Sequence, residues 1–242
     1  MPNNKKTAIC FTGTCRALQF THENIKNNLI FSNPNCDLFF FITKNKHSDK
    51  INEYFKDIDN ANIIIDTEDE EDLSGLIFKP LWPNPPSTHQ IFMRMLRSRK
   101  KCAQMLEDYT NKHNIEYNVV GFSRLDVKYF NMINLSLFFG DDEALIIPDF
   151  HSTYGNVIDG YNDRFAIGTQ QDLVCYLNAY DSARPFVENG GLLHAETLLK
   201  WHLQNNGVNV KSAPIRFTRV RGDGEEIDLR IEHKFTWRRH DT

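Results

Sequence analysis

The spacing of apolar residues divides the first half of the chain into short strands and helices that alternate. Apolar runs bounded by turn-forming residues predict buried strands, whereas apolar residues three or four positions apart predict helices that bury one face. The predicted strands cover residues 7–11, 37–43, 62–66 and 117–122. One predicted helix begins at Thr21, and two others cover residues 49–55 and 88–113. Strands that alternate with helices favour a mostly parallel sheet with helices on both faces.

The second half of the chain has a more mixed pattern. It predicts strands at residues 144–148, 164–168, 208–211 and 215–221 and helices at residues 170–184 and 195–205. We find no internal repeat and no long flexible linker. We therefore predict a single α/β domain over residues 1–242, with a mostly parallel central sheet flanked by helices in a Rossmann-like arrangement.

Composition limits what this domain binds and where it works. Apolar residues make up 40% and charged residues 25% of the chain, as in ordinary globular proteins. The formal net charge of -4 lacks the basic excess of a dedicated duplex-binding protein, so we expect no nucleic-acid partner. No apolar run is long enough to span a membrane, and residues 1–6 lack the apolar core of a signal peptide. We therefore expect a cytoplasmic protein with no membrane span.

The cysteines and histidines do not follow the spacing of a zinc site. The 9 histidines contain no HExxH pattern, and the 5 cysteines contain no CxxC pair. Because the number of cysteines is odd and their spacing is wide, reduced thiols are favoured over a disulfide framework. The cysteines are Cys10, Cys15, Cys36, Cys102 and Cys175.

The first candidate segment for ligand binding is Thr12-Gly13-Thr14-Cys15-Arg16, directly after the first predicted strand. In open α/β sheets, ligands bind beyond the carboxyl ends of the strands. Gly13 lets backbone N–H groups approach a phosphate, and Arg16 adds a fixed positive charge with forked donors. The segment follows neither the GxGxxG nor the Walker A pattern. The alternative is a plain strand-to-helix turn with a surface arginine.

The second candidate segment, Arg124-Leu125-Asp126, follows the fourth predicted strand. A carboxylate at a strand end can hold a hard divalent cation through oxygen, and the cation can neutralise a diphosphate. Arg124 would contact the same phosphates or orient Asp126. The alternative is a structural ion pair between Arg124 and Asp126.

The residues around this second segment also carry a family resemblance. Tyr117-Asn118, an apolar run and then Arg124-Leu125-Asp126 resemble the pattern Tyr-Asp-apolar-Arg-x-Arg-x-Asp. That pattern is found in a group of small bacterial and large-virus glycosyltransferases with the GT-A fold, in which this strand binds the metal and the nucleotide diphosphate. The resemblance implies that Arg124 binds the sugar donor and that Asp126 is a ligand of Mn²⁺ or Mg²⁺.

Three further segments resemble the same group. Gln90 stands near the start of the preceding predicted helix, as the group's glutamine does. Residues 162–168 resemble its Asn-Asp-Arg-Phe-Ala-x-Gly strand, and residues 194–199 resemble its His-Pro-Glu-x-x-Leu helix start. The resemblance spans roughly residues 7–221. The sequence departs from the group's pattern at Asn118, Ser123, Leu125 and Ala195.

Two carboxylates are candidates for the base that takes the proton of the acceptor hydroxyl. The resemblance places Glu196 in the position of the group's active-site acid, near a helix start that would keep the carboxylate ionised. The alternative for Glu196 is a first-turn glutamate that stabilises its helix. Asp163 is the second candidate base, and its alternatives are an ion pair with Arg164 or a contact with acceptor hydroxyls.

Basic residues gather on the long helix predicted at 88–113. Arg94 and Arg97 lie three positions apart and therefore share a face. We place Gln90, Arg94 and Arg97 near the nucleotide, because the first half of this helix should flank the strand ends. The basic cluster also contains Arg99, Lys100 and Lys101, and most of it is expected to be solvated surface.

Two charged segments remain outside these candidates. The acidic stretch at residues 68–72 is interpreted as a solvated loop, because like charges repel and stay in water. In the C-terminal tail, His233 is interpreted as a surface histidine, with closure of the site or a contact with the metal as the alternative. The tail also contains the basic residues Lys234, Arg238 and Arg239, which would contact phosphates or an anionic surface. The alternative is that the tail is frayed.

The main hypothesis is a glycosyltransferase that moves a hexosyl or deoxyhexosyl group from a nucleoside diphosphate of the UDP or GDP type to a glycan hydroxyl. Residues 1–130 would bind the nucleotide, through Thr12, Gly13 and Arg16 among others, and residues 131–242 would face the acceptor. We expect inversion at the anomeric carbon, because two candidate bases are present and no obvious nucleophile is. The alternative is a non-catalytic nucleotide- or glycan-binding relative of the same fold. An NAD-dependent enzyme is disfavoured because the glycine fingerprint is absent.

Overall fold

The fold is taken from a computed structural model of the chain. It describes residues 6–67, 69–80, 87–138, 144–150, 153–154 and 158–227. The tail with His233, Lys234, Arg238 and Arg239 lies outside the described residues, as does Glu68 of the acidic stretch.

Seven strands form the central sheet in the order β10-β6-β9-β4-β1-β2-β3. Their bounds are Thr7–Gly13 (β1), Asp37–Thr43 (β2), Ala61–Asp66 (β3), Val119–Arg124 (β4), Leu145–Pro148 (β6), Phe165–Gly168 (β9) and Val210–Ala213 (β10). Strand β9 runs antiparallel to both of its neighbours, β4 and β6, whereas the other paired neighbours are parallel. The expected mostly parallel sheet is therefore confirmed.

Two small antiparallel pairs accompany the central sheet. In the first pair, β5 (Val127–Tyr129) follows β4 closely and pairs with β11 (Phe217–Arg219). In the second pair, β7 (Thr153–Tyr154) joins β8 (Ile158–Asp159). The first pair carries the C-terminal part of the described chain back to the end of β4.

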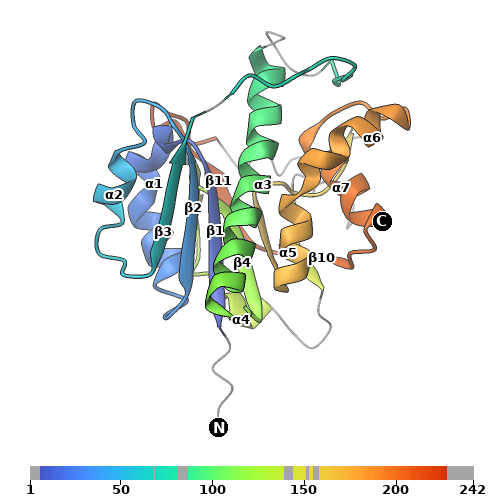
Figure 1. Cartoon of the computed structure of the whole chain (residues 1–242). Coiled ribbons are helices and arrows are strands. Elements are labelled where there is room, and N and C mark those ends of the chain that lie inside the picture. The colour runs from blue at the N-terminus through green and yellow to red at the C-terminus, as the bar shows by residue number, and fades with distance from the viewer. Residues whose placement is uncertain are drawn as a thin grey trace, which may run out of the picture.

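Helices cover both faces of the sheet (Figure 1). The longest helix, α3, crosses the strands on the face turned to the viewer, beside α5, while α1 and α2 belong to the opposite side. The bounds are Leu18–Ile25 (α1), Lys50–Tyr54 (α2), Ser87–His113 (α3), Leu135–Phe138 (α4), Gln170–Leu177 (α5), Ala183–Glu188 (α6) and Ala195–Asn205 (α7). Short 3-10 or π segments lie at Cys15–Ala17, Lys26–Ile30 and Ala179–Ser182.

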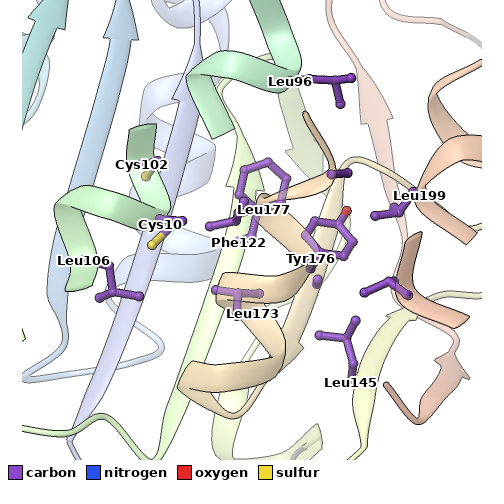
Figure 2. Packing of buried hydrophobic residues seen from close by; sticks show 14 of the residues in the cluster. Cys10, Leu96, Cys102, Leu106, Phe122, Leu145, Leu173, Tyr176, Leu177 and Leu199 are labelled. Atoms are coloured by element: carbon purple, nitrogen blue, oxygen red, sulfur yellow. The ribbon is translucent and has the colours of Figure 1, made fainter. Parts of the chain in front are cut away.

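Alternate residues of each inner strand point into different cores. In β1, Ala8 and Cys10 belong to the core under α3 and α5, whereas Ile9 and Phe11 belong to the core under α1 and α2. This alternation explains why the strands are apolar throughout, since a parallel strand covered on both faces buries every side chain. Figure 2 shows the first core, where Phe122 of β4 packs against helical side chains. Each fully buried aromatic side chain of this kind stabilises the fold by about 1.5–3 kcal/mol.

Two expectations about the helices are wrong. Thr21 does not begin the first helix but lies inside α1, buried, and its hydroxyl donates a 2.7 Å hydrogen bond to the carbonyl of Leu125. The helix expected at residues 170–184 is broken after Leu177, and α6 begins again at Ala183. Pro185 has no amide hydrogen and therefore fits the first turn of a new helix better than the middle of a long one.

A helix that crosses a membrane needs about 20 consecutive, mostly apolar residues. Within the described ranges, no helix is both long enough and apolar enough to cross a bilayer.

Candidate functional site

A pocket of about 270 Å³ lies beyond the carboxyl ends of the inner strands. The chain passes from β1 to β2 and β3 on one side, then returns through α3 to place β4 on the other side of β1. The carboxyl ends of β1 and β4 therefore mark the topological switch point, where open α/β sheets bind ligands. In Figure 1 this edge is at the top, where α3 begins. The lining residues are Thr12, Gly13, Thr14, Arg16, Thr43, Asn45, Ile91, Met95, Ser98, Arg99, Arg124, Leu125 and Asp126.

The turn after β1 brings the first predicted segment into this pocket. Gly13 ends β1 with a φ of +126°, a backbone conformation that side chains with a Cβ rarely adopt. The chain then turns through Cys15–Ala17, which leaves Thr14 and Arg16 at the pocket. Thr12, Gly13 and Arg16 are thus brought together as the sequence suggested.

Arg124 and Asp126 meet at the end of β4 in a two-point ion pair. The Nε of Arg124 donates to Oδ1 of Asp126 at 2.8 Å, and its Nη2 donates to Oδ2 at 2.6 Å. Burial alone would raise the pKa of Asp126, but the charge of Arg124, aided by Arg219 and Arg16, lowers it below the usual range. The ion pair that the sequence left as an alternative is therefore present.

The strand pair β5–β11 holds Asp126 in place. The backbone N–H of Val220 donates to the Asp126 carbonyl at 2.8 Å, and Arg219 pairs with Val127 in the strand register. Arg219 was not among the predicted site residues. Its position depends on a strand pairing over almost a hundred residues, which local sequence patterns do not report.

The donor set fits a divalent cation poorly. Asp126 is the predicted metal ligand, but both of its oxygens accept hydrogen bonds from Arg124. Among the described residues, no three His, Cys, Asp or Glu side chains form a group that could hold a metal ion. Mn²⁺ and Mg²⁺ prefer several oxygen ligands. The metal hypothesis stays a prediction, but the residues present do not support it.

Behind the pocket, a second group of charges is almost fully buried. Arg99 donates from Nη2 to the carboxylate of Asp163 at 2.8 Å and to its backbone carbonyl at 2.6 Å. The side chains of Arg99 and Asp163 are only 1% and 3% exposed. Burial raises the pKa of Asp163, but the charges of Arg99, Arg164 and Arg124 outweigh that effect and hold the pKa well below its usual range. Asp163 is thus an ion-pair partner in this structure.

Glu196 lies in the same buried group, in the first turn of α7. One carboxylate oxygen is 3.0 Å from Nδ1 of His194, and the other is 3.7 Å from Nη2 of Arg164. The backbone N–H of Arg124 donates to the Arg164 carbonyl at 3.2 Å, so the group adjoins the end of β4. Asp163 and Glu196 are therefore close to the pocket without being among its lining residues.

Several buried donors in this group have unmet hydrogen-bonding capacity. Within the described part of the chain, Nε of Arg99 and both Nε and Nη1 of Arg164 have no hydrogen-bond partner. A buried donor without a partner costs about 1–3 kcal/mol, and more when it is charged. Such donors next to a pocket indicate that a polar or anionic ligand satisfies them.

The structure does not bring Gln90, Arg94 and Arg97 to the pocket lining. The amide of Gln90 exchanges hydrogen bonds of 2.9 and 2.8 Å with the backbone of Glu71. Arg97 forms salt bridges with Glu71 at 3.0 Å and Asp69 at 3.4 Å, and Arg94 donates to the Asp69 carbonyl. Arg94 and Arg97 line a smaller neighbouring hollow. Their contacts anchor the acidic segment; a role in donor binding stays a prediction.

The expectation of solvated charge is wrong at Glu71 and Arg99, whereas Asp69, Glu70 and Asp72 of the acidic stretch are exposed. Glu71 of the acidic stretch is buried and accepts a 2.7 Å hydrogen bond from the hydroxyl of Tyr180. Arg99 is buried, and its guanidinium lies over the ring of Phe122 at 5.3 Å. The spacing of Phe92, Leu96 and Arg99 along α3 places Arg99 on the apolar stripe, and that signal was available in the sequence.

Comparison with known proteins identifies the family of this chain. The model of a family described as "Domain of unknown function (DUF7796)" matches residues 2–222. The chain belongs to this family. The DUF7796 match contains all the lining residues of the pocket and the buried charges behind it, but its description names no activity. A search of curated proteins found no match.

Proposed function

We propose that this DUF7796 protein is a glycosyltransferase that uses a nucleoside diphosphate sugar of the UDP or GDP type and transfers the sugar to a glycan hydroxyl. One observation carries the proposal. Gly13, Arg16 and Arg124 meet in a pocket at the topological switch point of the sheet, with carboxylates close behind. Arginine guanidinium groups and open backbone turns are suited to phosphate oxygens.

In this proposal, the pocket holds the donor and the buried charges hold the reacting end of the sugar. Arg16 and Arg124 contact the diphosphate, while Thr12 and Gly13 let the backbone approach it. Glu196 takes the proton of the acceptor hydroxyl as the acceptor oxygen attacks the anomeric carbon from the face opposite the diphosphate. This single displacement inverts the configuration at that carbon.

Glu196 is a better candidate for the base than Asp163. A general base works best when its pKa lies near the working pH. The pKa of Asp163 is held far below that range by Arg99 and Arg164, and one of its oxygens accepts from Arg99 at 2.8 Å. The proposal therefore gives Asp163 the task of positioning Arg99 beside the pocket.

One set of contacts favours a second candidate function, a non-catalytic nucleotide- or glycan-binding protein. Asp126 and Asp163 both accept hydrogen bonds from arginines, and Glu196 lies 3.0 Å from His194. Carboxylates with such partners can serve a purely structural purpose. A binding protein would bind nucleotide diphosphates but would neither transfer nor hydrolyse a donor.

The proposed function is tested by incubating the protein with a panel of UDP- and GDP-sugars and measuring release of the nucleoside diphosphate. We expect slow hydrolysis of one donor without acceptor and faster release with a suitable glycan. Glu196→Gln keeps the shape of the side chain but removes the accepting charge, so we expect transfer to fall about 10²–10⁴-fold with donor binding retained.

The matched control is Glu188→Gln, which makes the same chemical change at an exposed position of α6. It should transfer as the parent does. Binding without any release by the parent would favour the non-catalytic alternative. Normal transfer by Glu196→Gln would mean that the base lies elsewhere.

A further inference from the structure

The charged side chains that line the pocket are mostly basic. Arg16, Arg99 and Arg124 line it from the β1 turn, α3 and β4, and Asp126 is the one acid among the described lining residues. Asp126 is already neutralised by Arg124, and Arg99 is neutralised by Asp163. Arg16 is exposed and forms no salt bridge with the acidic side chains that the structure describes. The pocket therefore presents an excess of positive charge at its mouth.

The positions of the charges around Asp126 suit an anion better than a cation. The two carboxylate oxygens of Asp126 face the guanidinium of Arg124, at 2.6 and 2.8 Å. A cation that approached these oxygens would displace Arg124 and would meet the positive charges of Arg16 and Arg219 nearby. An anion instead would bridge Arg16 and Arg124 without breaking the ion pair.

Hydrogen-bond donors without partners extend the preference for an anion into the buried group of charges. Arg99 lines the pocket, and its Nε has no hydrogen-bond partner among the described residues. Arg164 is 7% exposed, its Nε and Nη1 lack partners within the described ranges, and its nearest carboxylate contacts are as long as 3.7 and 3.9 Å. Guanidinium groups with free donors recognise phosphate oxygens by paired hydrogen bonds.

We infer that the pocket binds the diphosphate of its nucleotide through arginine guanidinium groups and without a divalent cation. The inference rests on the proposed function, because it concerns how the same pocket holds the donor. Arg16 and Arg124 take the place that the sequence analysis gave to Mn²⁺ or Mg²⁺, and Asp126 serves to orient Arg124.

The chemistry of the transfer is balanced without a metal. The bond between the anomeric carbon and the diphosphate oxygen breaks, and its electron pair remains on that oxygen. The acceptor oxygen forms the new bond to the anomeric carbon, and its proton moves to Glu196. The negative charge that develops on the departing diphosphate is stabilised by the fixed charges of Arg16 and Arg124, which need no reorganisation during the reaction.

Isothermal titration calorimetry with UDP, GDP and inorganic pyrophosphate tests the inference, because it measures binding independently of transfer. Each probe is titrated into the full chain in EDTA and, in parallel, UDP and GDP are titrated in Mn²⁺. We expect at least one probe to bind in EDTA, and the dissociation constant of a bound nucleotide to change less than about threefold in Mn²⁺. Arg16→Ala should weaken binding in EDTA by about 10- to 100-fold, since it removes a charge-assisted contact.

Two further variants separate the roles of charge and metal. Asp126→Asn removes a negative charge beside the phosphate site but keeps a side-chain oxygen that accepts from Arg124, so binding in EDTA should be retained or tighten by about threefold. Lys112→Ala removes an exposed positive charge near the far end of α3 and is the control for overall charge. Circular dichroism and thermal melts establish that each variant is folded before it is titrated.

The outcomes that would overturn the inference are distinct from those that would overturn the proposed function. UDP or GDP binding that appears only with Mn²⁺, or a gain in affinity with Mn²⁺ that Asp126→Asn removes, overturns the inference and leaves a metal-dependent transferase. Binding in EDTA that Arg16→Ala and Lys112→Ala weaken equally also overturns it. Absence of binding by all three probes in EDTA and by UDP and GDP in Mn²⁺ overturns the inference and the proposed function together.

Discussion

At the scale of single residues, the buried ion pair of Arg99 and Asp163 determines how the charges behind the pocket are balanced. Both side chains are almost completely removed from water, and their hydrogen bonds measure 2.8 Å to the carboxylate and 2.6 Å to the carbonyl. Breaking a buried pair by removing one charge is strongly destabilising, because the remaining charge has no water to solvate it. Asp163 therefore contributes to stability whatever its role in chemistry.

The first prediction follows from the lowered pKa of Asp163. A carboxyl whose folded pKa lies below its unfolded value, about 3.9, stabilises the fold above that value and loses this contribution as the pH falls towards the folded pKa. Asp163→Asn should lower the free energy of unfolding at pH 7 by about 3–5 kcal/mol. It should also lose less stability than the parent between pH 5 and pH 3. Urea denaturation across this pH range measures both effects.

The control for this prediction is Asp108→Asn, which changes an exposed aspartate on α3. Its stability should follow that of the parent over the whole range. If Asp163→Asn and the parent lost stability equally on acidification, the pKa of Asp163 would not be lowered in the folded protein.

The sequence predicted the outer part of the site better than the inner part. Thr12, Gly13, Arg16, Arg124 and Asp126 converge because each lies at or just after the end of a strand whose apolar run is easy to recognise, and parallel strands end at one edge. The buried group was only partly predictable. Whether a charged residue is solvated or paired depends on what faces it across the fold, and local spacing does not contain that information.

At the scale of elements, the bounds of the inner strands were predicted closely, because strands buried on both faces are continuous apolar runs. The structure ends β1 at Gly13 and β2 at Thr43, and α3 begins at Ser87, within two residues of the predicted bounds in each case. The direction of β9 and the pairing of β5 with β11 were not predicted. Both depend on partners distant in the sequence, and a short apolar run is compatible with either direction.

A close approach between Gly160 and the start of α7 leads to the second prediction. A Cβ added to Gly160 would lie 2.4 Å from the backbone carbonyl carbon of Glu196, and the N–H of Tyr161 donates to that carbonyl at 3.0 Å. The contact is with backbone, so no side chain can move aside. Gly160→Ala should therefore destabilise the protein by about 1–3 kcal/mol, as overpacked sites do, and should displace Glu196. Urea denaturation and transfer assays measure the two effects.

Gly222→Ala is the matched control, because a Cβ there would be 3.6 Å from the nearest atoms, in the side chain of Arg16. We expect a change within about 0.5 kcal/mol. If Gly160→Ala were as stable as Gly222→Ala, the contact between the segment after β8 and α7 would be looser than the structure has it.

At the scale of the whole molecule, the two halves of the chain share one sheet and one site. Strand β9, from the second half, is inserted between β4 and β6, and its Ile167 pairs with Gly121 of β4. Asp163 and Glu196 also come from the second half, yet their charges act on Arg124 at the end of β4. The division at residue 130 therefore does not correspond to separate cores: both of the hydrophobic clusters contain residues from both halves.

The last prediction follows from this shared sheet. We expect a single cooperative unfolding transition, with coincident melts by calorimetry and circular dichroism and equal calorimetric and van't Hoff enthalpies. Leu38→Ala in β2 and Leu199→Ala in α7 each empty a fully buried position, and each should lower stability by about 2–5 kcal/mol. Because the halves share their cores, either variant should shift the whole transition to lower temperature. Two separate steps, with each variant moving only one of them, would mean that the halves unfold independently and that β9 does not join them into one unit.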